Sequence, residues 1–317
     1  MITTDINKAK QSLIHDNIIA MPTETVYGLA ANAYSESAIK KIFTLKKRPY
    51  NNPLIIHIKA ASYLNTIACD IPDMGLKLAE KFWPGPLTLV LKKQTHISDL
   101  ITAGKETVAI RVPNHPIALA LLNELTFPLA APSANPYGSI SPTTAAHVLG
   151  YFKDELEVIL DGGECESGVE STIIGFEDNK PVLYRHGSIC IKDIEQIVGK
   201  LSITTNNNNK PNAPGMSSRH YAPMTNTYLT NNVTELLKSF SDKKIGLLLF
   251  NNKLLNTENI IQEVLSENGN IKEAAQKLYA ALHRLDKCNL DIIIAEKFPN
   301  KGLGKTINDR LQRAIMK

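Results

Sequence analysis

The sequence predicts an α/β protein in which a twisted sheet of mixed strand directions is followed by a smaller Rossmann-like α/β domain. Short apolar runs, typical of buried strands, alternate along the chain with amphipathic segments of helical period. An Asn- and Pro-rich stretch interrupts this alternation at residues 201–223. The length of 317 residues and the hydrophobic fraction of 43% suit one large domain or two ordinary ones. We therefore predict a first domain over residues 1–200, a linker over 201–223 and a second domain over 224–317.

The first domain is organised around a strand–turn–helix–strand unit near its N-terminus. The apolar run 18–21 predicts a buried strand, and Pro22 ends it because proline has no N–H for a strand ladder. Ser35 is a typical N-cap for the helix that follows, and Pro49 stops that helix. The apolar run 54–58 predicts the next strand.

Polar side chains gather at the ends of this unit. Residues 23–25 (Thr-Glu-Thr) follow the first strand, where ligands usually bind in an open α/β sheet, and residues 46–48 (Lys-Lys-Arg) lie at the helix exit. Each feature also has a purely structural interpretation. The basic residues would complement the helix dipole, the Thr-Glu-Thr turn would cap its own backbone, and His57 would be an ordinary core histidine.

The remaining elements of the first domain follow from the same signals. In chain order we predict a helix over 5–15, a helix over 75–82, strands over 87–91 and 107–112, a helix capped by Asn114 with Pro116 in its first turn and ending near 124, a strand over 127–131, a helix opened by Ser141 as N-cap and Pro142 at its first position, strands over 158–160, 171–176 and 182–185, and a helix over 192–200.

Two of these predicted elements carry residues with a second interpretation. Arg111 lies in a half-buried strand, so its guanidinium needs either a structural carboxylate or a ligand anion as partner. The helix N-terminus at Ser141 suits an anion, although plain capping is the interpretation that this feature favours on its own.

The second domain alternates strands and helices with short loops, as a Rossmann-like domain does. We predict strands over 244–250 and 291–295 and helices over 271–286 and 307–316. The run 302–306 (Gly-Leu-Gly-Lys-Thr) ends like a phosphate-binding P-loop, but the first glycine of that motif would have to stand where Pro299 does. We therefore interpret this run as a turn before the last helix.

Charge and cysteine usage exclude several classes of protein. The net charge is +4, and residues 1–223 hold 21 basic and 21 acidic residues, which leaves 14 of 35 basic and 10 of 31 acidic residues for the remainder. The first domain is therefore not a nucleic-acid binder driven by net charge. The four cysteines form no CxxC pair and no zinc spacing, which favours reduced thiols in a cytoplasmic protein. No run approaches the roughly 20 apolar residues of a membrane span, and no secretory signal is evident.

Six motifs in sequence resemble the YrdC/Sua5 family. The resemblance spans nearly the whole chain, and its motifs stand in the family's order. They are Pro22-Thr23-Glu24-Thr25-Val26-Tyr27-Gly28-Leu29, Lys46-x-Arg48-Pro49-x-x-x-Pro53-Leu54, Trp83-Pro84-Gly85-Pro86-Leu87-Thr88, Val108-Ala109-Ile110-Arg111-Val112-Pro113, Ala131-Pro132-Ser133-Ala134-Asn135 and Gly168-Val169-Glu170-Ser171-Thr172-Ile173. The length points to the two-domain Sua5 branch, so the resemblance implies a YrdC-like catalytic domain and a Sua5 C-terminal domain. The segment 214–223 resembles the family's linker, which reaches back over the active site, although a stiff hinge with an incidental tyrosine is the alternative.

The resemblance implies an L-threonylcarbamoyladenylate synthase, a nucleotidyltransferase. Such an enzyme forms threonylcarbamoyl-AMP and pyrophosphate from L-threonine, bicarbonate and ATP, with Mg²⁺ carried by the ATP. The product serves the N6-threonylcarbamoylation of adenosine 37 in tRNA, so the implied partner is the transferase machinery that receives it. Whether tRNA itself binds stays open at this stage.

Site residues are carried over position by position. Those implied to bind ATP are Lys46, Arg48, Asn52, Thr107, Ser133, Asn135, Ser141, Arg185 and Tyr221. Those implied to surround L-threonine are Thr23, His57, Arg111, Ala131 and Ser171, with Arg111 pairing the substrate carboxylate. The resemblance implies no general acid or base, because a carbamate oxygen is already anionic, and it names no protein ligand for the metal. His186 follows Arg185 where the family usually has proline.

Two other functions use the same features. A non-catalytic binder of structured RNA would use the same concave basic surface, without ATP turnover and with a strong dependence on salt. A carbamoyl-transfer accessory domain would take carbamoyl phosphate, but such domains are usually fused to zinc-finger-like ones, for which the cysteine spacing here offers no match.

Overall fold

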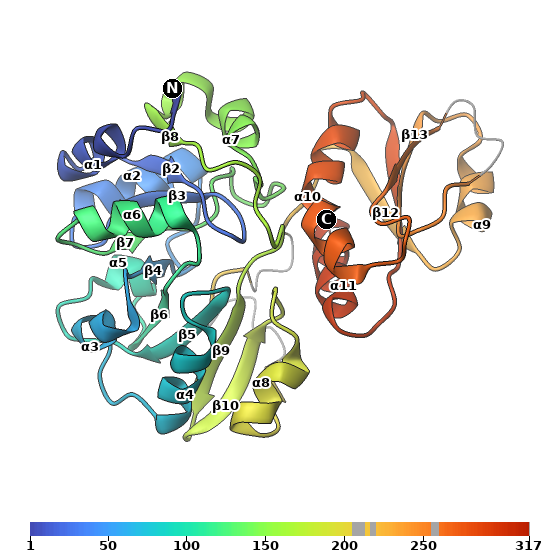
Figure 1. The fold of residues 1–317 in the computed structure, drawn as a ribbon. Helices are drawn as coiled ribbons and strands as arrows, with labels where there is room; N and C mark the ends of the chain where they lie inside the picture. Colours follow the sequence, from blue (N-terminus) through green and yellow to red (C-terminus); the bar gives the residue numbers. More distant parts are fainter. Residues whose placement is uncertain (205–212, 216–219, 255–259, 317) are drawn as a thin grey trace.

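The computed structural model describes residues 1–204, 213–215, 220–254 and 260–316. Within them the chain forms two sheets, one in each half of the molecule (Figure 1). The first has eleven described strands in the order β1-β8-β2-β3-β7-β4-β6-β5-β9-β10-β11, and the second has four in the order β12-β15-β13-β14. The predicted fold class, a mixed α/β sheet followed by a smaller α/β domain, is confirmed.

The first sheet carries most of its helices in the crossovers between strands. Its elements are β1 (Ile2–Thr3), α1 (Ile6–Ile14), β2 (Ile19–Met21), β3 (Gly28–Asn32), α2 (Glu36–Lys46), β4 (Ile55–His57), η1 (Ala61–Tyr63), α3 (Leu64–Ile67), α4 (Asp73–Phe82), β5 (Leu87–Lys92), α5 (Asp99–Thr102), β6 (Thr107–Arg111), α6 (Pro116–Glu124), β7 (Leu129–Ala130), α7 (Ala145–Phe152), η2 (Lys153–Glu155), β8 (Val158–Leu160), β9 (Thr172–Glu177), β10 (Lys180–Arg185), α8 (Ile191–Val198) and β11 (Ser202–Ile203). The edge strand β11 falls inside the stretch predicted as linker.

The register of the first sheet brings distant motifs to one place. β4 and β6 are parallel with His57 opposite Arg111, and β5 and β9 are parallel with Leu87 opposite Thr172. His57, Arg111 and the residue before Thr172 therefore lie near one edge of the sheet, at strand ends. This is where open α/β sheets place their ligands.

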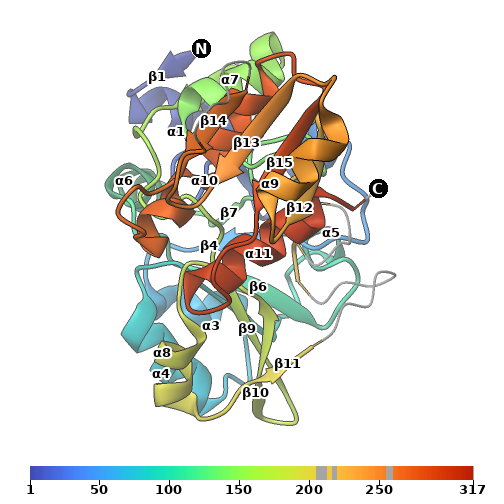
Figure 2. The same cartoon turned by 90° about the vertical axis from the view of Figure 1, so that its right-hand side faces the viewer.

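The described strands of the second sheet are all parallel, with helices between β12 and β13 and between β14 and β15. Its elements are β12 (Asn226–Thr230), α9 (Val233–Leu237), η3 (Lys238–Phe240), β13 (Ile245–Leu249), β14 (Ile261–Val264), α10 (Ile271–Asp286), β15 (Ile292–Glu296) and α11 (Leu303–Ala314). Helices α10 and α11 lie on the side that faces the first domain (Figure 1). Figure 2 views the second domain from its outer side, with β12, β13 and β15 in front of the first domain.

One apolar cluster is shared by the two domains. It joins Val26, Ile140 and Val169 of the first domain with Leu278 of α10 and Leu311 of α11. Tyr221, from the end of the linker, belongs to the same cluster. The second domain thus packs directly against the loops that follow the first domain's strands.

Several predicted elements are confirmed closely. Helix α10 has the predicted bounds, and so has β8. Ser35 caps α2, since its side chain accepts a hydrogen bond from the Ala38 N–H at 3.2 Å. None of the described helices is both long enough and apolar enough to span a bilayer.

Other predictions are wrong, for local reasons. Strand β3 was not expected, because Gly28–Asn32 is rich in Gly and Ala and lacks the β-branched residues that mark strands. Thr144, not Ser141, caps α7, because its side chain accepts from the His147 N–H, and His115 rather than Asn114 precedes α6.

The last helix also begins earlier than predicted. Helix α11 starts at Leu303, so most of the glycine-rich run expected as a turn is helical. Gly304 fits there because a Cβ at its position would come within 1.9 Å of the Pro299 carbonyl oxygen.

Candidate active site

A pocket opens at the strand ends of the first domain and is closed on one side by the end of the linker. Most of its lining residues come from five of the six motifs and from the linker, and the others come from β4 and β10. They are Thr23, Thr25, Val26, Gly28, Arg48, Ile55, His57, Arg111, Ala131, Pro132, Ser133, Glu170, Ser171, Arg185, Pro214, Gly215, His220 and Tyr221.

Arg111 forms a buried ion pair beside this pocket. Its Nη2 lies 2.7 Å from Glu24 Oε2, and both side chains are 4% exposed. Its Nη1 donates to Thr25 Oγ1 at 2.8 Å and its Nε to the Gly85 carbonyl at 3.2 Å. The structural carboxylate that a buried arginine requires is therefore Glu24. A substrate carboxylate would have to share the guanidinium with it.

His57 lies next to Arg111 across the β4–β6 ladder. Burial, together with the positive charge of Arg111, lowers the pKa of His57 to about 3. The ring is therefore neutral near pH 7. Its Nδ1 is buried and has no hydrogen-bond partner among the described residues, so a polar ligand in the pocket would satisfy it.

Hydroxyl groups line the same end of the pocket. Thr23 Oγ1 donates to the Val26 carbonyl at 2.7 Å and lies 2.9 Å from Thr25 Oγ1, so the Thr-Glu-Thr turn caps itself as expected. Ser171 Oγ lies 2.7 Å from Thr88 Oγ1, on the strand paired with β9. These turns place the hydroxyls rigidly at the pocket wall.

Three further cations lie at the other end, and none has a carboxylate partner at ion-pair distance among the described residues. Arg48 donates to Asn52 Oδ1 and to the Pro53 carbonyl, both at 2.7 Å. Arg185 donates to the carbonyl and the hydroxyl of Ser171, at 2.9 and 3.0 Å, and to the Pro214 carbonyl at 3.1 Å, so it borders the first end of the pocket as well. Lys46 donates to the Ser133 and Asn135 carbonyls.

Burial disfavours all three of these positive charges. It lowers the pKa of Arg48 to about 10, and it lowers the pKa values of Lys46 and Arg185 as well. Neutral carbonyls compensate a buried cation only in part. A polyanion is therefore the ligand that this end of the pocket would stabilise most.

The linker reaches the pocket through Pro214, Gly215, His220 and Tyr221. Ala222 N–H donates to the Gly138 carbonyl at 2.8 Å, which anchors the end of the linker to the first domain. Tyr221 has a left-handed φ of 64° and is 1% exposed. Its hydroxyl is buried and has no partner among the described residues. Residues 201–223 were expected to reach over the site, and 205–212 and 216–219 of that stretch lie outside the described residues.

The pocket brings together nine of the fourteen residues implied by the resemblance. Those that line it are Thr23, Arg48, His57, Arg111, Ala131, Ser133, Ser171, Arg185 and Tyr221. Lys46, Asn52, Asn135 and Ser141 are buried behind it, each held by protein groups. Thr107 begins β6 at the end opposite Arg111 and does not line the pocket.

Sequence reasoning missed four residues around the pocket. Glu24 and Glu170 stand inside quoted motifs, but a motif does not say which of its side chains pair with arginine. His220 was noted only as part of the linker segment. Arg310 of α11, which pairs with Glu170, has no local signal at all, because nothing in an amphipathic helix marks the arginine that will be buried.

Comparison with known proteins gives matches over nearly the whole chain. Residues 11–187 match a family model described as "Telomere recombination" and named for Sua5, YciO and YrdC, and residues 189–315 match one described as "Threonylcarbamoyl-AMP synthase, C-terminal domain". A threonylcarbamoyl-AMP synthase of Pyrococcus abyssi is 41% identical over 94% of this chain and 90% of its own length. One of Bacillus subtilis is 40% identical over 98% of this chain and 92% of its own.

A solved structure agrees with these matches. The crystal structure of P. abyssi Sua5 complexed with L-threonine superposes with a TM-score of 0.91 at 40% identity, covering 98% of this chain and 94% of that one. The likeness therefore extends to both domains and to the linker between them.

Proposed function

The chain belongs to the Sua5 family, and from this premise we propose that it is an L-threonylcarbamoyladenylate synthase. It would form threonylcarbamoyl-AMP and pyrophosphate from L-threonine, bicarbonate and ATP, which makes it a nucleotidyltransferase. The observation that carries the proposal is the division of the pocket. Hydroxyls, a neutral His57 and Arg111 lie at one end, and Arg48 lies toward the other, with Arg185 bordering both through Ser171; neither Arg48 nor Arg185 has a carboxylate partner at ion-pair distance among the described residues.

The first end suits a small amino acid. Arg111 offers charge to a carboxylate, and the unpartnered Nδ1 of His57 offers a hydrogen bond to a hydroxyl or an amine. The Thr23 and Ser171 hydroxyls complete a polar wall. The P. abyssi relative was crystallised in complex with L-threonine, which supports L-threonine as a substrate.

The other end suits a triphosphate. Arg48 and Arg185 line the pocket, and their donors could turn from backbone carbonyls to phosphate oxygens with little movement. Catalysis would then rest on positioning and on stabilising the charge of the transferring phosphoryl group. No protein base is needed, because the carbamate oxygen that attacks the α-phosphorus is already anionic.

Mg²⁺ would enter as part of the substrate, bound to the triphosphate. Among the described residues no group of three or more His, Cys, Asp or Glu side chains could hold a metal by itself. The two carboxylates beside the pocket, Glu24 and Glu170, are each paired with an arginine. The chain's contribution would be Arg48 and Arg185 on the remaining phosphate charge.

The proposal includes a place for the product. Threonylcarbamoyl-AMP is a reactive mixed anhydride, so a transferase must consume it, and the family's role makes this the tRNA t6A37 machinery of the cytoplasm. Direct contact with tRNA is not required by this pocket.

A dropout assay tests the proposed reaction. The purified chain is incubated with ATP, Mg²⁺, bicarbonate and L-threonine, and pyrophosphate and the AMP adduct are followed by mass spectrometry. We expect the adduct only when threonine and bicarbonate are both present. A reaction with L-serine in place of L-threonine is the matched control for the amino-acid end.

The same assay separates the alternative function. If ATP is left intact while a folded tRNA binds with an affinity that falls steeply with salt, the protein is an RNA-binding member of the fold. In that outcome the roles given above to Arg48, Arg111 and Arg185 are wrong.

A further inference from the structure

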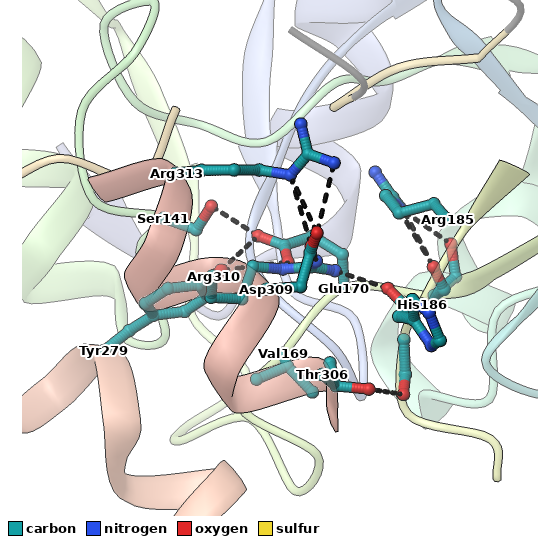
Figure 3. Close-up of polar contacts among 12 residues, drawn as sticks. Ser141, Val169, Glu170, Arg185, His186, Tyr279, Thr306, Asp309, Arg310 and Arg313 are labelled. Atoms are coloured by element: carbon teal, nitrogen blue, oxygen red, sulfur yellow. Dashed lines mark hydrogen bonds and ion pairs between the residues drawn. The ribbon is translucent and has the colours of Figure 1, made fainter. Parts of the chain in front are cut away.

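Arg310, on helix α11 of the second domain, is buried at the junction of both domains and the linker. Its side chain is 1% exposed, and its three nitrogens point to three different groups. Nε donates to Glu170 Oε2 at 2.7 Å, Nη2 donates to the His186 carbonyl at 2.7 Å, and Nη1 donates to Asp309 Oδ2 at 2.6 Å (Figure 3).

Two of these groups lie next to residues that line the pocket. Glu170 immediately precedes Ser171, and His186 immediately follows Arg185. The guanidinium therefore joins the start of β9 to the end of β10 from outside the first sheet. Arg185 itself donates to the Ser171 carbonyl, so the two arginines hold the same two segments from opposite sides.

Glu170 is held as a carboxylate by this junction. Burial raises its pKa, but the charges of Arg310 and Arg185 and the hydrogen bond from Ser141 outweigh burial and lower the pKa below its ordinary value. Its oxygens also accept from the Tyr279 hydroxyl of α10, at 2.9 and 3.0 Å. A buried ion pair often adds little net stability, because removing two charges from water costs about as much free energy as their attraction returns. A role in positioning the groups around it is therefore the better explanation of this pair.

A fourth contact of Arg310 is with the linker. Its guanidinium carbon lies 4.7 Å from the centre of the Tyr221 ring, and the ring of Tyr279 stacks on Tyr221 at 5.8 Å and 25°. Tyr221 lines the pocket, and its buried hydroxyl has no partner among the described residues. Its ring is therefore held by two residues of the second domain.

We propose that Arg310 is a positioning residue, through which the second domain fixes Glu170 and the Tyr221 ring at the nucleotide end of the pocket. The inference rests on the proposed function only for the identity of the nucleotide. On this basis the second domain contributes to the site without contacting the reacting atoms. It holds the linker tyrosine and the β9–β10 segments in a single arrangement.

Hydrogen exchange tests the positioning without any substrate. The variant Arg310→Met keeps an apolar stem and removes the guanidinium. We expect the amide of Ala222, which donates to the Gly138 carbonyl, to exchange at least tenfold faster in this variant. Strand β13, in the core of the second domain, should exchange at the wild-type rate, which shows that the domain is still folded.

Two further variants keep the test decisive. Glu170→Gln/Arg310→Met removes both charges, so it leaves no unpaired buried ion if the single variant fails to fold. Arg284→Met is the matched control, because Arg284 pairs with Glu263 entirely within the second domain, at 2.8 and 2.6 Å. It should leave the exchange of Ala222 unchanged.

Steady-state kinetics then separate positioning from mere stability. Loss of folded protein lowers the maximal rate but leaves KM unchanged, whereas a misplaced Tyr221 should raise KM for ATP at least tenfold in the folded variants. Arg310→Lys, which keeps the charge but not the fork of donors, should fall between wild type and Arg310→Met.

The outcomes divide cleanly. A folded Arg310→Met or double variant with wild-type exchange at Ala222 overturns the inference, whatever its activity. If wild type forms no AMP adduct, the proposed function fails, while the exchange result still decides the positioning. If exchange quickens but KM for ATP stays at the wild-type value, Arg310 orders the linker without serving the site, and the inference is wrong.

Discussion

At the scale of single residues, Glu24 and Arg111 depend on each other. Each side chain is 4% exposed, so removing one leaves a buried charge without its partner. Such losses cost about 3–5 kcal/mol, more than most point mutations do. The stability of the site therefore depends on Arg111, the same residue that would bind the substrate carboxylate.

We expect Arg111→Met to lower the free energy of unfolding by about 3 kcal/mol and to abolish adduct formation. The paired variant Glu24→Gln/Arg111→Met should recover most of the stability and none of the activity. Urea unfolding and the dropout assay measure the two effects separately. Activity in the folded pair would show that Arg111 has no role toward the substrate.

For Tyr221 we expect a mutation to affect activity strongly and stability only slightly. Its hydroxyl is buried with no partner among the described residues, so removing it costs the fold little. We expect Tyr221→Phe to change the free energy of unfolding by less than about 1 kcal/mol and to raise KM for ATP about tenfold, the effect of one hydrogen bond to a charged group.

The larger variant Tyr221→Ala also removes the ring that Arg310 and Tyr279 contact. It should reduce kcat/KM further than Tyr221→Phe does. If both variants keep wild-type kinetics, the linker does not take part in the site.

At the scale of secondary-structure elements, helices α7 and α10 meet through two stacked histidines. The rings of His147 and His283 lie 3.9 Å apart at 20°, and His283 Nε2 lies 3.2 Å from the Ser141 carbonyl oxygen. Burial, then the charge of His283, lowers the pKa of His147 to about 3, and burial lowers the pKa of His283 to about 4.

This contact predicts acid sensitivity. An unfolded histidine titrates near pH 6.5, so below that pH the two histidines are protonated in the unfolded chain but stay neutral in the folded protein. The stability is fully present above pH 6.5 and is lost as the pH falls toward 4. We expect His147→Phe to reduce the loss between pH 7 and pH 5 by about 1 kcal/mol, allowing for partial exposure.

Urea unfolding at the two pH values measures this difference. His15→Gln is the control, because it removes a histidine that is exposed on the surface. An equal loss in wild type and His147→Phe would mean that other buried groups, such as His57, His186 and His220, account for it.

At the scale of the whole molecule, one glycine permits the two domains to dock. A Cβ at Gly168, whose φ is +66°, would come within 2.1 Å of the Gln276 carbonyl oxygen on α10. The backbone of the first domain therefore approaches a helix of the second more closely than any other residue allows. This contact lies two residues before Glu170, at the start of the junction with Arg310.

We expect Gly168→Ala to cost about 3 kcal/mol or more, since it combines backbone strain with a clash that forces the domains apart. Gly104→Ala is the matched control, with a φ of +71° and nothing within 4 Å, so it should pay only the strain of about 1 kcal/mol. Calorimetry measures both. Equal losses in the free energy of unfolding of the two variants would show that α10 shifts to accommodate the Cβ and that docking does not require Gly168.

Much of the fold could be predicted because its signals are local. The apolar period of α10, the Ser35 cap and Pro49 after α2 are properties of neighbouring residues, and each was confirmed. Strand β3 and the true cap of α7 could not be predicted in the same way. Gly and Ala are uninformative in a strand that pairs on both edges, and two hydroxyl residues a few positions apart compete for one cap.

The candidate site also has one part that could be predicted from the sequence and one part that could not. The motifs determined the family, and the resemblance they carry implied nine of the residues that line one pocket, because a ligand requires particular side chains whatever surrounds them. The partners of those side chains were decided only by the tertiary structure. Glu24 faces Arg111 because β2 and β6 end at the same edge, and Arg310 reaches Glu170 across 140 residues because two domains dock. Which side chains pair with each other depends on how whole helices and strands pack, and no local sequence pattern contains that information.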